Sequence, residues 1–164
     1  MSTIHLAGFP RIGAKRELKF LVEQFWKNEI DDAALQAGAR ELRQKHWLLQ
    51  KGAGLDLSPV GDFSLYDHVL DAQVLVGAIP RRFGFDAANL SAAQYFQLAR
   101  GNSSQHAIEM TKWFDSNYHY LVPEWHADTA FAANPAPLLA QIAEAQALGI
   151  KAKPVLIGPL TLLW

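Results

Sequence analysis

The most informative segment of this chain is Gly8-Phe9-Pro10-Arg11-Ile12-Gly13-Ala14-Lys15-Arg16-Glu17-Leu18-Lys19. The apolar residues 4–9 precede Pro10, which favours extended backbone in the residue before it, so they predict a strand. From residue 18 onward, apolar residues follow the i, i+3, i+4, i+7 spacing of an amphipathic helix that ends near residue 28. The stretch therefore predicts a strand, a turn and a helix in succession.

The head of this predicted helix is unusually basic. A helix N-terminus carries about half a positive charge and favours carboxylates, yet Lys15, Arg16 and Lys19 gather here and only Glu17 has the favourable sign. Cations beside free backbone N–H groups form an anion receptor. Arg16 and Lys19 are three residues apart, so one helical face presents both and can hold two carboxylates or phosphates. The alternative is a solvated basic face.

The composition excludes several classes of protein. The chain has 164 residues, of which 50% are hydrophobic, which is enough for one folded domain and argues against disorder. Its formal net charge is -1 and it has no long Lys/Arg run, so a nucleic-acid-binding surface is not expected. The basic cluster is local, which suits a small anion.

The numbers and spacing of cysteine and histidine residues limit which metal sites this chain can form. The chain contains no Cys, which excludes disulfides and thiolate-bound zinc within it, and its six His residues show no metal-binding spacing. Neither a signal peptide nor about 18 consecutive apolar residues is found, so we expect a soluble, cytoplasmic protein with no membrane contact. A Gly-rich phosphate loop is also absent.

The rest of the chain alternates between helix and strand signals. Asp31 is a good N-cap, Ser64 and Asp67 resemble a capping box, and Ser91 with Gln94 forms a second one. Residues 105–115 are ambiguous between helix and strand. The other predicted elements are helices over 31–52, 66–76, 91–100 and 134–149, and strands over 55–62, 118–123 and 152–157.

This alternation favours an α/β fold with a largely parallel sheet in a single domain. A closed (β/α)₈ barrel takes about 200 residues or more, and only about four strand candidates are present. The chain is therefore either part of a barrel or a small open sheet.

Two further groups of residues could carry chemistry. Asp62, Asp67 and His68 could transfer protons if the loop after residue 61 brings them together, although capping by Asp67 is a simpler role. Lys112 lies among large apolar residues, where a cation either seeks an anion or extends to solvent.

Four aromatic residues near Lys112 leave two roles open. They could stack on a flat ring, or they could belong to the core. They are Trp113, Tyr118, Tyr120 and Trp125.

Several motifs resemble cobalamin-independent methionine synthase. They are residues 8–13 with Arg16-Glu17-Leu18-Lys19, residues 60–63, Tyr66-Asp67-His68, Glu109-Met110-Thr111-Lys112-Trp113-Phe114, and Asn117-Tyr118-His119-Tyr120. The resemblance spans the chain. It implies that residues 1–164 are the N-terminal segment of the first of two (β/α)₈ barrels, which is incomplete in this chain.

The same resemblance implies a function. The family moves a methyl group from 5-methyltetrahydropteroyltriglutamate to homocysteine to make methionine, with zinc activating the homocysteine thiol. Its zinc ligands, homocysteine site and proton donor belong to the second barrel, so no catalytic or metal-binding residue is expected here. The residues implied to contact the folate are Arg16, Glu17, Leu18, Lys19 and Lys112, with the basic groups reading the triglutamate tail.

Three hypotheses follow for the chain by itself. It is the folate-binding part of the methyltransferase and is inactive alone, or it is a stand-alone module that binds polyanions or folate polyglutamates without catalysis. The third is a structural fragment that self-associates through open strand edges and uncovered apolar faces.

Overall fold

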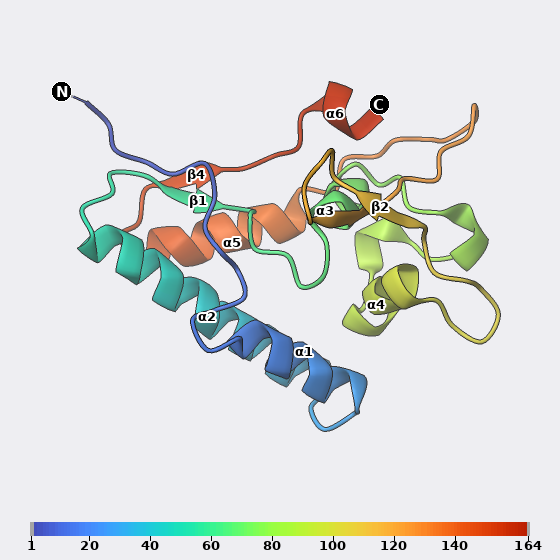
Figure 1. Cartoon of the computed structure of the whole chain (residues 1–164), viewed down its shortest axis with the longest axis horizontal. Coiled ribbons are helices and arrows are strands. Elements are labelled where there is room, and N and C mark those ends of the chain that lie inside the picture. The colour runs from blue at the N-terminus through green and yellow to red at the C-terminus, as the bar shows by residue number, and fades with distance from the viewer. Residues whose placement is uncertain (1, 164) are drawn as a thin grey trace. The chain divides into compact units, whose positions relative to one another are not determined.

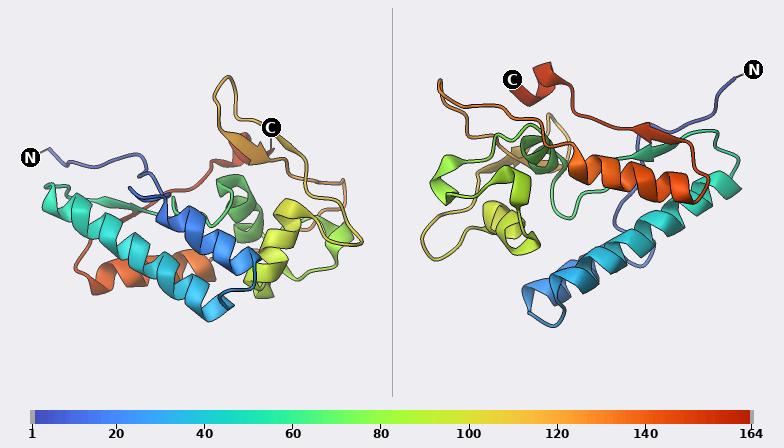
Figure 2. Two further views of the ribbon diagram at one scale, coloured as in Figure 1. Left: turned by 60° about the horizontal axis from the view of Figure 1, so that its bottom comes forward. Right: turned by 180° about the vertical axis from the view of Figure 1, so that it is seen from behind.

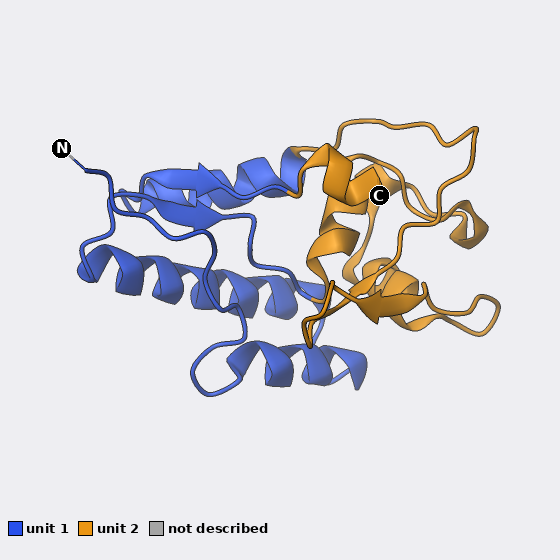
Figure 3. Cartoon of the chain, turned by 45° about the horizontal axis from the view of Figure 1, so that its top comes forward, with its two compact units in different colours: residues 1–65, 136–156 blue, residues 66–135, 157–164 orange. Residues whose placement is uncertain are grey.

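The computed structural model describes residues 2–163, which divide into two compact units (Figure 3). Unit 1 contains residues 2–65 and 136–156, and unit 2 contains residues 66–135 and 157–163. Both units combine helices with a two-stranded sheet, which confirms the predicted mixed α/β class.

A helical hairpin makes up much of unit 1. Helix α1 (Glu17–Trp26) is followed by α2 (Asp32–Gly52), which runs back alongside it (Figure 1). The predicted N-cap is confirmed, because the Asp31 side chain accepts the N–H of Ala34 at 2.8 Å. Gly38 permits the close approach of the two helices, since a Cβ there would lie 2.8 Å from Cδ1 of Leu21. The interface buries the predicted apolar stripe, including Leu18, Val22, Leu35, Ala39 and Leu42.

The sheet of unit 1 pairs strands that are distant in sequence. Strand β1 (Ser58–Val60) lies parallel to β4 (Ala152–Pro154), and α5 (Ala136–Ala147) packs against both (Figure 1). Their core contains Trp47, whose indole N–H donates to the carbonyl oxygen of Pro59 at 3.0 Å. The strand predicted over residues 4–9 is reduced to one parallel bridge between His5 and Leu57.

Unit 2 is built from short elements around a second core (Figure 2). Buried residues of that core include Leu70, Leu98 and Leu121. The elements are α3 (His68–Leu75), η1 (Arg81–Phe83), η2 (Ala87–Asn89), α4 (Ala92–Arg100), β2 (Met110–Lys112), β3 (His119–Leu121) and α6 (Pro159–Leu163).

The structure resolves the ambiguous residues 105–115. Part of that stretch is β2, which pairs antiparallel with β3. The described residues therefore form one parallel and one antiparallel strand pair, rather than the largely parallel sheet that alternation predicted. A short turn at residues 113–118 connects β2 and β3, and such a turn can join only antiparallel neighbours.

A second predicted cap is confirmed and another is wrong. Ser91 and Gln94 form a reciprocal capping box at α4, with the Gln94 N–H 3.2 Å from Oγ of Ser91 and the Ser91 N–H 3.0 Å from Oε1 of Gln94. The predicted Ser64–Asp67 box does not form, because α3 starts later and Asp67 itself is its N-cap.

Candidate anion-binding site

The basic turn of unit 1 ends in a residue with unusual backbone geometry. Arg16 has φ 61° and ψ 34°, the left-handed region, and α1 begins only at Glu17. A residue other than glycine in this region costs on the order of 1–3 kcal/mol and persists only where its surroundings hold it. Two backbone hydrogen bonds do so, from the Arg16 N–H to the Gly13 carbonyl and from the Leu18 N–H to the Ile12 carbonyl, both 3.1 Å.

The cations of Arg16 and Lys19 share one aromatic surface. The guanidinium carbon of Arg16 lies 5.7 Å from the centroid of the Phe20 ring, and the ammonium nitrogen of Lys19 lies 6.0 Å from it. All three side chains are exposed, with Phe20 at 48%. The structure brings both cations to one ring, although Arg16 precedes α1 and so does not share a helical face with Lys19 as predicted. Sequence reasoning missed Phe20. An aromatic residue outside the apolar stripe of α1 was the signal for it.

Among residues 2–163, only one weak carboxylate contact competes for these cations. Lys19 lies 3.6 Å from Glu23, and the two side chains are 46% and 37% exposed. Exposed pairs of this kind contribute at most about 1 kcal/mol. The face remains available to an external anion.

Glu17 is hydrogen-bonded to groups of unit 1 through both of its carboxylate oxygens. Its Oε2 accepts the backbone N–H of Lys15 at 2.8 Å, and its Oε1 accepts from Nζ of Lys45 on α2 at 3.2 Å. Hydrogen bonds from the backbone N–H groups of Glu17 and Lys15, and then from Lys45, hold the pKa of Glu17 below its ordinary value of 4.5. The carboxylate is therefore ionised at neutral pH and already bonded.

Leu18 points away from solvent. Its side chain is 1% exposed and belongs to the hydrophobic core. Its N–H donates to the Ile12 carbonyl, and the Lys15 N–H donates to the Glu17 carboxylate. The sequence predicted that free N–H groups of the turn would bind an anion. Because those of Lys15 and Leu18 are already bonded, the turn would bind an anion mainly through its cationic side chains.

The turn is tied to the end of β1. The carboxylate of Asp62 accepts the Phe9 N–H at 2.7 Å, and Nη1 of Arg11 donates to the Ser64 carbonyl at 3.0 Å. Arg11, which lies upstream of the basic cluster, is thus engaged in holding the turn.

Asp67 has a structural role in unit 2. Its buried carboxylate accepts the N–H groups of Leu70 at 2.9 Å and Leu121 at 3.2 Å, and the Tyr118 hydroxyl at 2.5 Å. These bonds cap α3 and fix β3 to it. The geometry supports the capping role considered for Asp67 and not proton transfer.

Lys112 is the last residue of β2 and is exposed. It lies opposite His119 in the register of the hairpin. No carboxylate of the described residues lies within ion-pair distance of its ammonium group. Lys112 belongs to unit 2, whereas Arg16 and Lys19 belong to unit 1.

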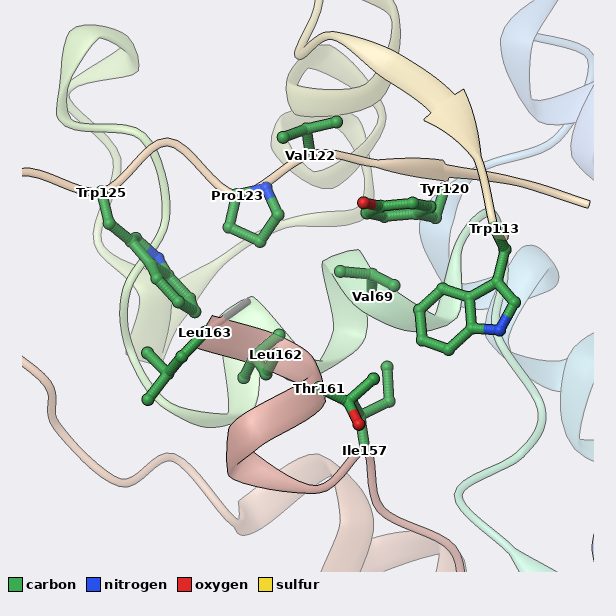
Figure 4. A pocket seen from close by; sticks show the side chains of 10 residues that line it. All are labelled: Val69, Trp113, Tyr120, Val122, Pro123, Trp125, Ile157, Thr161, Leu162 and Leu163. Atoms are coloured by element: carbon green, nitrogen blue, oxygen red, sulfur yellow. The ribbon is translucent and has the colours of Figure 1, made fainter. Parts of the chain in front are cut away.

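Three of the four aromatic residues near Lys112 line a pocket within unit 2 (Figure 4). Trp113, Tyr120 and Trp125 face it together with apolar side chains such as Val69 and Leu162. The rings of Trp113 and Tyr120 pack edge to face, 5.3 Å apart at 84°. The pocket holds about 100 Å³, well below the roughly 300 Å³ of common ligand sites, so we interpret it as a gap in a core.

No three His, Asp or Glu side chains among residues 2–163 are grouped closely enough to hold a metal ion. None of the helices in this range has the length and apolar character needed to cross a membrane.

Comparison with known proteins shows the family of this chain. The family described as "Cobalamin-independent synthase, N-terminal domain" matches residues 3–164. The chain belongs to this family. It is 62% identical over 164 residues to the 5-methyltetrahydropteroyltriglutamate–homocysteine methyltransferase of Neisseria meningitidis serogroup C, and 60% identical to those of Neisseria gonorrhoeae and Haemophilus influenzae. Each match covers 100% of this chain but 22% of the relative, so the chain spans about a fifth of the length of these relatives.

Proposed function

We propose that this chain is the folate-tail-binding N-terminal part of a methyltransferase that moves the methyl group of 5-methyltetrahydropteroyltriglutamate to homocysteine. In this proposal Arg16, Lys19 and Lys112 bind the carboxylates of the triglutamate tail. Glu17 and Leu18 hold the turn that presents Arg16. The isolated chain binds folate without turning it over.

One observation carries the proposal. Arg16 and Lys19 hold their cations over a single exposed ring, Phe20, and the backbone of Arg16 is strained into the arrangement that places it there. Strain of this kind concentrates at functional sites. A tail with several carboxylates matches two adjacent cations better than a single carboxylate does, because each charge pairs separately.

The fold proposal follows from the family. We infer that residues 1–164 form the N-terminal segment of the first (β/α)₈ barrel of the longer enzyme. Supporting it, the parallel pair of β1 and β4 in unit 1 is packed by α2 and α5, as strands of a barrel are packed by their helices.

The resemblance also implies a zinc ion that activates the homocysteine thiol. The residues of this chain do not fit zinc, because the sequence has no Cys and residues 2–163 contain no suitable group of His, Asp and Glu. The proposal therefore assigns this chain to binding the folate and assigns it no step that involves zinc.

Calorimetric titration tests the proposal. The chain is titrated with 5-methyltetrahydropteroyltriglutamate and separately with the monoglutamate, at low and at moderate salt. We expect tighter binding of the triglutamate, with a difference that shrinks as salt rises, because exposed charge pairs are screened. Arg16→Gln, Lys19→Gln and Lys112→Gln are each expected to reduce that preference.

Lys27→Gln is the matched control. Lys27 is exposed at the other end of α1 and its removal changes the net charge by the same amount. Equal affinity for the two ligands in the unmodified chain, or an equal loss in Lys27→Gln and Arg16→Gln, would contradict the proposal.

A further inference from the structure

We propose that Glu17 and Lys45 form a positioning pair that holds Arg16 in its binding geometry, and that Glu17 does not itself contact the folate. The inference rests on the proposed function and names Lys45, on a different helix, as a determinant of the same site.

The geometry links α2 to the strained residue through one carboxylate. Nζ of Lys45 lies 3.2 Å from one oxygen of Glu17, and the other oxygen accepts the Lys15 N–H at 2.8 Å. Arg16 lies between Lys15, whose backbone N–H donates to this carboxylate, and Glu17, which carries it. Fixing Lys15 and Glu17 on either side of it restricts the backbone of Arg16 to its left-handed conformation.

The turn is shaped around this carboxylate. Gly13 has φ 83°, and a Cβ added there would lie 2.2 Å from Oε2 of Glu17. A side chain at position 13 and the carboxylate in its present place are therefore incompatible. Oε2 of Glu17, which accepts the Lys15 N–H, occupies the space where a side chain at position 13 would lie.

The charges around Glu17 decide how its role can be tested. The charges of Lys45 and His46 face it from α2, whereas Lys15 contributes only its backbone N–H. A carboxylate this close to an anion site opposes anion binding through space, so its removal by itself strengthens binding. A positioning role has the opposite sign, because Arg16 is released when the carboxylate is neutralised. The direction of the change in Glu17→Gln therefore separates the two roles.

The experiment compares triglutamate affinities of variants by calorimetry. We expect Glu17→Gln to weaken binding about two- to fivefold, the range for one exposed ion pair. Glu23→Gln is the matched control, because Glu23 lies on the same helix and pairs with Lys19, so its removal is expected to leave binding unchanged or stronger.

Lys45 supplies an independent variant at an exposed position. Its side chain is 66% exposed, and we expect Lys45→Arg to keep the affinity while Lys45→Met loses as much as Glu17→Gln. The double variant Glu17→Gln/Lys45→Met should lose no more than either single variant, since the two side chains act as one unit. Thermal unfolding midpoints verify that each variant is folded.

The outcomes distinguish the two proposals. If Glu17→Gln binds the triglutamate as tightly as the unmodified chain or more tightly, while Arg16→Gln still loses the preference for it, the positioning role is overturned and the proposed function stands. If the unmodified chain shows no preference for the triglutamate, both are overturned.

Discussion

Arg43 and Glu144 form a bidentate ion pair between α2 and α5. Nε of Arg43 lies 3.0 Å from Oε2 of Glu144, and Nη2 lies 3.0 Å from Oε1. Arg43 is 7% exposed, and burial lowers the pKa of its guanidinium while Glu144 partly restores it. The pair links positions 101 residues apart in unit 1.

Glu144→Gln is expected to lower the free energy of unfolding by about 3 kcal/mol, because it leaves a buried guanidinium unpaired. Urea denaturation measures the change. Arg40→Gln is the control, since Arg40 pairs with the same carboxylate but is 56% exposed, and about 1 kcal/mol or less is expected from it. Equal losses in the two variants would show that burial of Arg43 has no energetic consequence.

Asp67→Ala is expected to cost about 3 kcal/mol, the sum of a lost helix cap and a buried N–H without an acceptor at Leu121. Thermal unfolding followed by circular dichroism measures it. Asp86→Ala, which removes the exposed cap of η2, is expected to cost about 1 kcal/mol or less. A loss at Asp67 no larger than at Asp86 would remove the central role assigned to this carboxylate in unit 2.

Arg16→Gly should separate stability from binding. Glycine adopts φ 61° without strain, so the free energy of unfolding is expected to rise by about 1 kcal/mol while the preference for the triglutamate is lost. Asn28 is also left-handed, at φ 58°, and Asn28→Gly is expected to stabilise the chain without changing binding. Denaturant titration and calorimetry on the same samples provide both numbers; destabilisation by Arg16→Gly would disprove the assigned strain.

His46 should make stability depend on pH. Its ring packs 5.0 Å from Phe9, and burial is the main cause that lowers its pKa from the ordinary 6.5, opposed by Glu17 and Asp62 and assisted by Lys45. As pH falls, His46 is therefore protonated at a higher pH in the unfolded chain than in the folded chain. Stability is lost as pH falls below about 6.5. Unfolding free energies between about pH 7.5 and 5 should fall more steeply for the unmodified chain than for His46→Gln. Parallel profiles would contradict this prediction.

Local signals in the sequence predicted most helices correctly. Asp31, Ser91 and Gln94 cap the helices that they were expected to cap, because a capping bond joins residues only three apart. The failure at Ser64 also has a local cause. Asp67 offers a stronger acceptor three residues later, and α3 starts from it.

Strand pairing was less predictable. The periodicity of hydrophobic residues predicts where a strand lies but not which strand it pairs with. It therefore did not predict the hairpin of β2 and β3 or the parallel pairing of β1 with β4. In the candidate site, the sequence identified Arg16 and Lys19 as neighbours, but their placement over Phe20 and the bond from Lys45 to Glu17 needed the structure. The self-association and the cytoplasmic location inferred from the sequence stay predictions.

Local sequence patterns were enough to predict the α/β class, the caps at Asp31 and Ser91, the basic turn and, through the motifs, the family. These properties are set by side chains within a few positions of one another or by the pattern of residue types. Only the tertiary structure decided that Arg16 adopts a left-handed backbone and that α2 supplies the cation that holds Glu17. The bond from Lys45 to Glu17 joins segments distant in sequence, and the Arg16 backbone depends on the path of the turn, so both geometries are fixed only when the chain has packed.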